Sequence, residues 1–199
     1  MPVASEPTGR RERNKQEKLR RIVAAAGELF AEHGVDDVTT QQIADRADIG
    51  AGTLFLYAKN KGELLLLVQN TAYADALARG VEAGSNEADV LDAVLAIARP
   101  IVECNRAQVE NGRTYLREMV FGDPDEPHHG EALRIVAQTE AAIAEVLRRD
   151  GRRTEDEAAT LAQVVSSINF IAMAASIHAS SGVTEILAAI RRQVAAILH

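Results

Sequence analysis

The chain has 199 residues and a net charge of −7; 47% of the residues are hydrophobic, only 4% are aromatic, and Ala, Leu, Glu and Arg dominate. This composition predicts packed helices and thus an all-α fold with one or two domains. The single Cys104 excludes an internal disulfide. We find neither an apolar run of roughly 18 residues that would span a bilayer nor the apolar centre of a signal peptide, so we expect a cytoplasmic protein.

The charge is unevenly distributed along the chain. Residues 1–61 contain 10 basic and 9 acidic residues, whereas residues 62–199 contain 12 basic and 20 acidic residues. Seven basic and two acidic residues lie within 9–21, so the positive charge is concentrated near the N-terminus. This segment is either a solubilising tail or an arm that binds a polyanion, and the acidic remainder argues against general polyanion binding.

Three helices are predicted in the N-terminal third. The first contains apolar residues that recur at helical spacing from Leu19 and ends at Gly34. Thr39 and Gln42 then match a capping box, in which each side chain bonds the other residue's backbone N–H, so a helix of about two turns should follow. The segment 51–58 is predicted to form another short helix after a sharp turn.

Longer helices are predicted in the rest of the chain. Asn60 and Glu63 match a second capping box, which would open a helix that runs toward Arg79. Pro100 should kink or divide the following helix, because proline lacks a backbone donor. The stretch 122–130 is rich in Asp, Pro and Gly and should be a loop. The remaining helices are predicted at about 87–101, 113–121, 131–149, 154–180 and 184–198.

A helix, a short helix, a sharp turn and another short helix form the arrangement of a helix-turn-helix DNA reader, whose last helix lies in the major groove. The small residues at 50–52 would let that helix approach the duplex closely, where its free amide groups favour a phosphate. With Leu54 and Ala58 facing inward, Leu56 faces outward between two aromatic residues. In a groove, Leu56 could cover a thymine methyl group while the aromatic residues reach the sugar-phosphate walls.

This stretch resembles the signature of the tetracycline-repressor (TetR) family of bacterial transcriptional regulators, roughly T-x-x-x-I-A-x-x-A-G-V-S-x-G-T-L-Y-x-Y-F-x-S-K-E-x-L. The resemblance covers about residues 15–70. It implies a flexible basic arm at 1–14, a three-helix helix-turn-helix domain at 15–62 and a helical ligand-binding and dimerisation domain at 63–199. The matching residues are Thr39, Ile43, Ala44, Ala47, Ile49, Gly52, Thr53, Leu54, Tyr57, Lys61 and Leu64.

The resemblance also implies which residues contact DNA. Thr39 and Thr40 match phosphate contacts at the start of the second helix, and Gln41 matches a position that can reach a base edge. Tyr57 and Lys61 match a phosphate-gripping aromatic residue and lysine. Ordinary alternatives are a capping threonine, a packing tyrosine and a solvated lysine. The complete implied set is Thr39, Thr40, Gln41, Gly50, Ala51, Gly52, Thr53, Phe55, Leu56, Tyr57 and Lys61.

Four positions depart from the family pattern. Asp48 stands where the family often has Gly, and Gly50 replaces a common Ser, which weakens the side-chain cap of the third helix. Phe55 stands where a Tyr is common, so it cannot donate a hydroxyl hydrogen bond to a phosphate. Ala58 replaces a common Phe and leaves more space behind the recognition helix.

The last two predicted helices carry apolar stripes at helical spacing. Two such helices at the end of the chain predict an isologous four-helix interface with a second copy, with burial in the chain's own core as the alternative. The stripe residues are Ala158, Leu161, Ala162, Val165, Ile168, Ala172, Ala175 and Ala179 in the first helix and Val183, Ile186, Leu187, Ile190, Val194 and Ile197 in the second.

The sequence indicates the ligand site only weakly. Methionine adapts to varied ligands, and an asparagine or a histidine could supply one polar contact in an apolar pocket. Packing in the core or exposure at the surface is the alternative for each candidate. The candidates are Tyr115, Met119, Phe121, Asn169, Phe170, Met173 and His178.

We therefore expect a ligand-responsive transcriptional regulator, a repressor, that binds a palindromic DNA operator as a homodimer and responds to a small-molecule inducer. We expect no cofactor and no enzymatic activity: a di-iron bundle needs Glu-x-x-His on two helices, and the only such motif is Glu126–His129 in a predicted loop. Two alternatives remain. One is a helical protein-interaction module without DNA affinity, and the other is a metal sensor that uses His128, His129 and the acidic residues beside them.

Overall fold

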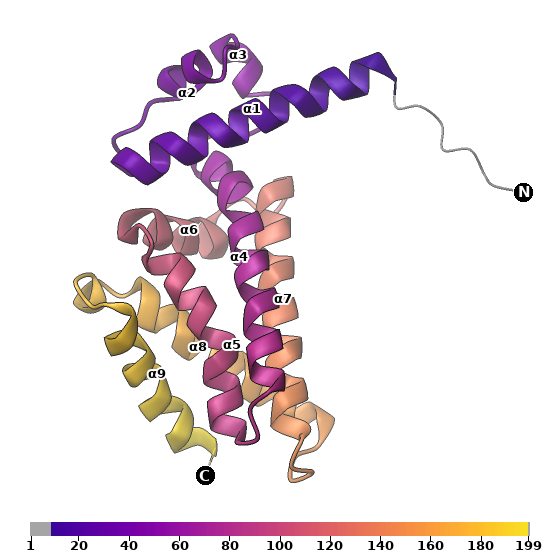
Figure 1. The fold of residues 1–199 in the computed structure, drawn as a ribbon, viewed down its shortest axis with the longest axis vertical. Helices are drawn as coiled ribbons and strands as arrows, with labels where there is room; N and C mark the ends of the chain where they lie inside the picture. The colour runs from indigo at the N-terminus through magenta and orange to yellow at the C-terminus, as the bar shows by residue number, and fades with distance from the viewer. Residues whose placement is uncertain (1–8, 199) are drawn as a thin grey trace, which may run out of the picture.

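The computed structural model describes residues 9–198, which form nine α-helices and one 3₁₀ turn and contain no strand (Figure 1). The predicted all-α class is therefore confirmed. The helices are α1 (Arg10–His33), α2 (Thr40–Arg46), α3 (Ala51–Leu54), α4 (Lys61–Ser85), α5 (Val90–Arg106), α6 (Val109–Phe121), α7 (Pro127–Arg148), α8 (Glu155–Ala174) and α9 (Val183–Leu198), with the 3₁₀ turn at Ser176–His178.

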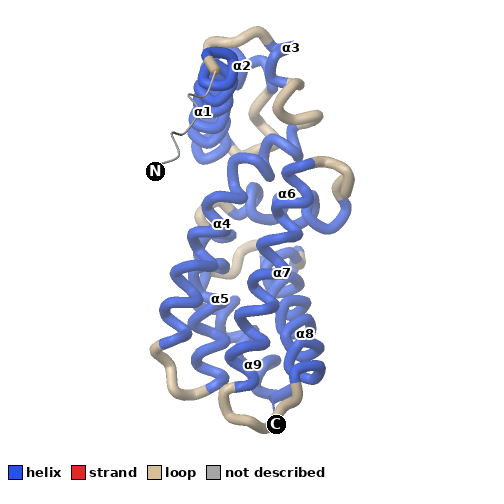
Figure 2. Tube along the Cα trace, turned by 90° about the vertical axis from the view of Figure 1, so that its right-hand side faces the viewer, coloured by secondary structure: helices blue, strands red, loops and turns tan. Residues whose placement is uncertain are grey.

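The helices α1, α2 and α3 form a small unit at one end of an elongated molecule, and α4 leads from this unit into a bundle of the remaining helices (Figure 2). Phe30 of α1, Ile43 of α2 and Leu54 of α3 meet in the core of the small unit, each at most 1% exposed. The first predicted capping box is confirmed. The hydroxyl of Thr39 accepts the Gln42 N–H at 3.2 Å, and the Gln42 side-chain oxygen accepts the Thr39 N–H at 2.8 Å.

Helix α1 begins at Arg10, well before the apolar pattern that starts at Leu19. Residues 10–14 of the predicted flexible arm are therefore helical, which corrects that prediction, while residues 1–8 lie outside the described part of the chain. Residues 11–18 are all exposed, so apolar spacing could not mark this start. Their Arg, Lys, Glu and Gln side chains have high helix propensity, which explains why the helix extends beyond its packed face.

Other predicted boundaries also need correction. Helix α7 begins inside the predicted loop 122–130, because Pro127 occupies a first helical position, where its missing N–H costs nothing. Helix α5 continues through Pro100 without being divided. Helix α3 ends at Leu54 and is followed by a turn rather than reaching residue 58. Helix α6 starts four residues earlier than predicted, and α8 ends six residues earlier.

The bundle is organised around α4, which packs along α5 and α7. Two glycines let α4 and α5 approach closely. A Cβ atom on Gly80 would lie 2.5 Å from the Ile97 carbonyl oxygen, and one on Gly84 would lie 2.9 Å from the Ala93 carbonyl oxygen. Any larger residue at these two positions would push α5 away from α4.

A buried amide fastens the small unit to the bundle. The side chain of Asn111, on α6, is 2% exposed. Its Nδ2 donates to the Phe30 carbonyl at the end of α1 (2.8 Å), and its Oδ1 accepts the Val35 N–H (2.7 Å). The Phe30 carbonyl also accepts the Gly34 N–H at 3.0 Å, so Asn111 gives it a second bond, whereas the buried Val35 N–H is paired through Asn111.

Eight of the fourteen residues in the apolar stripes of the last two helices are buried in the chain's own core, which corrects their assignment to a dimer interface; the other six are half-buried, and the interface itself stays a prediction. Ala158, Ala162 and Val165 of α8 and Ile186 and Ile190 of α9 are completely buried within one subunit. Helical spacing identifies a buried face, but it does not say whether the covering surface belongs to the same chain. The opposite face of α8 is exposed, with Val164 at 40% and Ile171 at 59%.

Helix α8 is also long and apolar enough to cross a membrane by length and composition, contrary to our expectation that no segment would be. Its Ser, Thr and Gln residues interrupt any continuous apolar run, yet they leave the average hydropathy of the helix high. Core helices of globular bundles meet the same criterion. Here α8 packs against α7, α9 and α6, as a core helix does.

Candidate DNA interface and ligand cavity

The recognition surface consists of the start of α3 and the turn that follows it. Leu54 and Ala58 are buried, at 1% and 6% exposure, as the inward-facing pair of the predicted recognition segment should be. Leu56 is 81% exposed and Phe55 is 51% exposed. Gly52 is open to solvent and has no atom within 4 Å of a Cβ position. A large apolar side chain exposed beside a bare helix end is unusual on a solvated surface and suits a groove.

Two of the predicted DNA-contacting side chains are bound within the protein. The Lys61 ammonium donates to the carbonyls of Asp36 (3.0 Å) and Val38 (3.1 Å), so it holds the loop that precedes α2. The Tyr57 hydroxyl donates to the Lys15 carbonyl on α1 at 3.3 Å. Both side chains therefore hold together the small unit of α1, α2, α3 and the turn after α3, which we call the recognition unit.

The start of α2 presents the other predicted contacts. Thr39 is exposed, and its hydroxyl caps α2 by accepting the Gln42 N–H. Thr40 is half-buried. Gln41 is exposed, and its Nε2 donates to Asp45 at 2.7 Å. To bind a base edge, the Gln41 side chain has to break its hydrogen bond to Asp45. Gly50, Ala51 and Thr53 lie at the N-terminus of α3. The Thr53 N–H donates to the Gly50 carbonyl at 2.8 Å, whereas the N–H groups that precede it in the helix have no helical partner and could bind a phosphate.

Asp48 lies in the sharp turn between α2 and α3 with a φ of 52°, the only positive φ of a non-glycine residue in 9–198. This left-handed conformation suits Gly better than any residue with a Cβ, although Asp tolerates it. The Asp48 carboxylate, which is almost fully exposed, pairs with Arg21 of α1 at 3.2 Å. Asp48, which stands where the family often has Gly, therefore strains the backbone at this turn.

The first turns of α4 and α7 meet beneath the recognition unit. Asn60 Oδ1 accepts the Glu63 N–H at 2.8 Å, but Glu63 does not return the bond, so only half of the second predicted capping box forms. The Glu63 side chain is buried beside His128 and His129 instead. Burial raises the pKa of Glu63, and the positive character of His128 opposes that shift.

His128 and His129 differ in their surroundings. A ring nitrogen of His128 lies 2.9 Å from the Tyr57 carbonyl, in the turn after α3. His129 is 4% exposed, and neither of its ring nitrogens has a partner among the described residues. Within 9–198 no three His, Cys, Asp or Glu side chains are placed to hold a metal ion, so the metal-sensor alternative finds no ligand set there.

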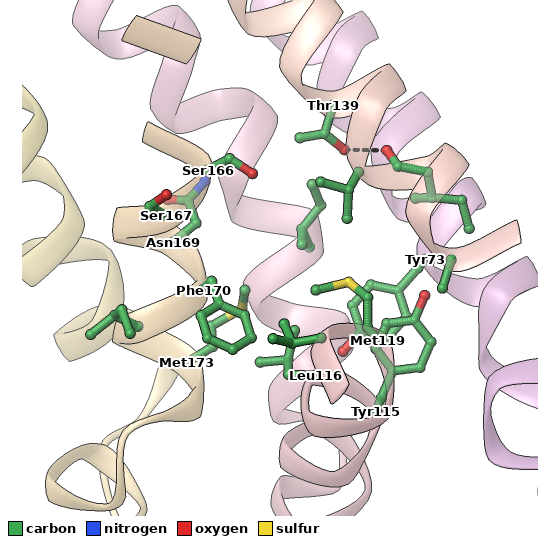
Figure 3. A pocket seen from close by; sticks show the side chains of 16 residues that line it. Tyr73, Tyr115, Leu116, Met119, Thr139, Ser166, Ser167, Asn169, Phe170 and Met173 are labelled. Carbon is green, nitrogen blue, oxygen red and sulfur yellow. Dashed lines mark hydrogen bonds between the residues drawn. The ribbon is translucent and has the colours of Figure 1, made fainter. Parts of the chain in front are cut away.

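A cavity of about 390 Å³ lies inside the bundle, between α8 on one side and α4, α6 and α7 on the other (Figure 3). Five of the seven predicted ligand residues line it. Phe121 does not, because it is 79% exposed at the end of α6, and His178 lies in the 3₁₀ turn outside the cavity. The five are Tyr115, Met119, Asn169, Phe170 and Met173.

Sequence reasoning missed Tyr73 of α4, which stacks on Tyr115 with a centroid separation of 4.1 Å. Burial raises the pKa of both hydroxyls, so both stay protonated. Tyr73 accepts a hydrogen bond from Asn105 at 3.0 Å, and Tyr115 donates to Asn70 Oδ1 at 2.9 Å. In the sequence, Tyr73 lies at the spacing of a helix's buried face, and nothing there distinguishes a cavity-lining tyrosine from an ordinary core residue.

Asn70 extends the bond of Tyr115 toward the recognition unit. Its Nδ2 donates to the His128 carbonyl at 2.9 Å, and the His128 ring is bonded to the Tyr57 carbonyl. Tyr115, Asn70, His128 and Tyr57 thus form a continuous line of contacts, which we call the polar path. It begins at the cavity wall and ends in the turn that carries Phe55 and Leu56.

The comparisons by sequence with known proteins concern the N-terminal region of the chain. Residues 22–68 match the family model described as bacterial regulatory proteins, tetR family. The fatty acid metabolism regulator protein of Bacillus subtilis (strain 168) is 37% identical over 54 residues, which make up 27% of this chain and only 28% of that protein.

Solved structures extend the likeness to the whole fold. A TetR transcriptional regulator from Rhodococcus sp. RHA1 superposes with a TM-score of 0.70 at 17% identity, over 93% of this chain and 97% of that one. Thermus thermophilus FadR, a TetR-family transcriptional repressor in complex with lauroyl-CoA, also gives a TM-score of 0.70, at 21% identity, over 90% of this chain and 92% of that one. The bundle that encloses the cavity is therefore part of a fold shared with these regulators.

Proposed function

We propose that the chain is a transcriptional regulator of the tetR family, whose model matches residues 22–68, that it represses transcription by binding operator DNA with α2 and α3, and that it releases that DNA when a small molecule fills the cavity. It acts in the cytoplasm, without a cofactor and without an enzymatic activity. The observation that carries the proposal is the polar path, because it joins the cavity wall to the turn after the recognition helix.

The polar path supplies a physical route for the response. A ligand that moves Tyr115 disturbs its bond to Asn70, and Asn70 is also bonded to the first turn of α7. Any shift of that turn changes the bond between His128 and the Tyr57 carbonyl. A ligand can act only through a difference in affinity for two arrangements, and such couplings are typically about 1–3 kcal/mol.

The DNA-contacting set is the one that the family resemblance implies, with two refinements. Lys61 and Tyr57 position the α1–α2 loop and α1, and their contacts with phosphate form when DNA binds. Leu56 and Phe55 cover base edges and sugar-phosphate walls, and the free N–H groups at the start of α3 bind a phosphate.

A second copy binds through the exposed face of α8 rather than through its buried stripe. Thr160, Val164, Ser167 and Ile171 recur along this face at helical spacing and are exposed in the single chain. Two readers related by a two-fold axis contact two symmetric half-sites, so the operator should be a near-palindrome.

The ligand of one structural relative is known, but its likeness to this chain is limited to the fold. The Thermus protein is complexed with lauroyl-CoA, but at 21% identity the likeness extends to the fold and not to the lining of the cavity. The class of ligand therefore has to be inferred from the residues that line this cavity.

The test has two stages. Selection from a random DNA pool should enrich a near-palindromic sequence, whose affinity falls steeply with salt because bound phosphates release counterions. Compounds that release this DNA are then titrated with and without it. The factor by which the compound weakens DNA binding must equal the factor by which DNA weakens compound binding. A tightly folded protein that enriches no sequence, or shows no salt dependence, would contradict the proposal and favour the protein-interaction alternative.

A further inference from the structure

We infer that helix α1 carries a second DNA-binding surface, outside α2 and α3. It consists of the side chains of Arg11, Lys15 and Lys18, which we call the basic ridge, and it binds phosphates of the DNA backbone beside the bases that α3 reads. The inference rests on the proposed function in one respect, since that proposal places DNA against α2 and α3.

The basic ridge lies on the same face of α1 as the residues that pack in the core of the recognition unit. Ile22 and Leu29 of α1 are buried in that core. The three ridge residues precede Ile22 by four, seven and eleven positions, so they continue the buried stripe toward the N-terminus. The stripe therefore changes from apolar to cationic where α1 leaves the core.

The part of α1 that carries the ridge extends beyond the core. Residues 11–18 are all exposed, and this end of α1 runs past α2 and α3 (Figure 1). Its position is fixed by the Tyr57 hydroxyl, which donates to the Lys15 carbonyl at 3.3 Å. Because Tyr57 directly follows the exposed Leu56, the ridge lies beside the surface that faces DNA.

The two faces of this extension differ in how their charges are balanced. On the face opposite the ridge, Arg20 pairs with Glu17 at 2.7 Å. Glu12, the other acidic residue of the extension, also lies off the ridge. None of the three ridge residues forms an ion pair with another residue of 9–198. The ridge is thus a purely cationic surface.

Stability of the single chain does not explain this arrangement. Positive charges three and four residues apart on one helix repel each other, as the neighbouring ridge residues do. A positive charge in the first turn, such as that of Arg11, also opposes the helix macrodipole, which favours acidic residues there. A bound row of phosphates would offset both effects, because each phosphate carries a negative charge.

The length of the ridge matches the spacing of phosphates in a DNA strand. Arg11 and Lys18 are seven residues apart, which is about 10 Å along the helix. Phosphates of one strand follow each other about every 3.4 Å along the duplex axis, so this length corresponds to about three of them. Phosphate contacts carry no sequence information, so the ridge adds affinity while α3 selects the sequence.

Two double variants of α1 test the ridge with the same change of charge. Arg11→Gln combined with Lys18→Gln removes two ridge charges that are seven residues apart. Arg13→Gln combined with Arg20→Gln, the matched control, removes two charges at the same spacing from the opposite face. Glutamine has nearly the helix propensity of Arg and Lys, so both variants should stay folded, which circular dichroism and thermal unfolding check.

Binding is measured at several salt concentrations with two probes, the selected operator duplex and a duplex of random sequence. We expect the ridge variant to bind both duplexes at least about tenfold more weakly than wild type. Its slope of log affinity against log salt should be smaller by about 1.8 for each bound chain, since each lost phosphate contact removes about 0.9. The control variant should bind within about threefold of wild type with an unchanged slope, because it loses only long-range attraction.

Equal losses in the two double variants, or no loss in the ridge variant, would overturn the inference. The proposed function is judged separately, from the wild-type protein. If wild type enriches an operator that the ridge variant binds equally well, the ridge fails and the proposed function stands. If wild type enriches no sequence but the ridge variant binds the random duplex more weakly than the control does, the proposed function fails and the ridge stands. If wild type binds neither duplex, both fail.

Discussion

The recognition unit and the ligand bundle hold their functional side chains in opposite ways. In the recognition unit, Leu56 and Phe55 stand exposed on a turn whose own core is complete. In the bundle, Tyr73, Tyr115 and Asn169 are buried, and they contribute to the fold as well as to the cavity. A change at Leu56 or Phe55 should therefore alter DNA binding and leave stability unchanged, whereas a change at Tyr73, Tyr115 or Asn169 should alter both ligand binding and stability.

The largest expected effect is on Asn111, whose side chain connects the recognition unit to the bundle. Replacing Asn111 by Ala leaves the buried Val35 N–H without its partner, which costs about 1–3 kcal/mol, and removes one of the two bonds of the Phe30 carbonyl, which is worth about 1 kcal/mol because that carbonyl keeps the Gly34 N–H. We expect a loss of roughly 3 kcal/mol in the free energy of unfolding, measured by urea denaturation. Asn86→Ala is the control, because its exposed amide also bonds a carbonyl, and it should cost less than about 0.5 kcal/mol.

The second prediction separates surface function from stability. Leu56→Glu places a charge on the surface that faces DNA, and we expect operator affinity to fall by about 100-fold, the effect of roughly 2.7 kcal/mol. Its melting temperature should stay within about 2 °C of wild type, since Leu56 has few contacts to lose. Val81→Glu adds the same charge at an exposed apolar position of α4 and should leave DNA affinity unchanged. Similar losses in both variants would place the DNA elsewhere.

The third prediction concerns the strained turn. Asp48→Gly should stabilise the protein by about 1 kcal/mol, because glycine adopts the left-handed conformation without the steric penalty of a Cβ. The exposed pair with Arg21 that it removes contributes little. Asp48→Ala has the same loss of charge and should destabilise instead. Equal unfolding midpoints for the Gly and Ala variants would show that backbone strain is not what distinguishes this position.

The smallest effect is the pH dependence that comes from Glu63. Its pKa is raised by burial, so the folded protein binds more protons than the unfolded chain between about pH 4.5 and the raised value. The free energy of unfolding should therefore fall as the pH rises through this window. Glu63→Gln cannot ionise and should lack this part of the dependence. Parallel stability curves for the two proteins would contradict it.

Local chemistry made the recognition unit predictable from sequence. The cap formed by Thr39 and Gln42 and the inward pair Leu54 and Ala58 depend on residues three or four positions apart, and all four lie as predicted. The predicted start of α7 was wrong because the local sequence was ambiguous. Pro127 follows a stretch typical of loops, and proline also opens helices, so composition alone could not decide.

The bundle was less predictable because its features depend on distant residues. The apolar stripe of α8 fixed which face is buried, but part of the surface that covers it comes from α5 and α6, which lie before α7 in the chain and are therefore distant from α8 in sequence. Tyr73 and Asn70 gained their roles only from contact with Tyr115 and His128. No spacing rule within one helix could indicate those pairs.

The most direct test of the polar path compares the two stacked tyrosines. Tyr115→Phe and Tyr73→Phe each remove one hydroxyl from the same cavity wall, but only Tyr115 is bonded to Asn70. A compound that releases operator DNA is used to measure the coupling factor, which is the ratio of operator affinities without and with saturating compound. This ratio does not depend on how tightly each variant binds the compound. We expect Tyr73→Phe to keep the wild-type factor and Tyr115→Phe to lower it at least fivefold, whereas equal factors in all three proteins would show that the signal travels by another route.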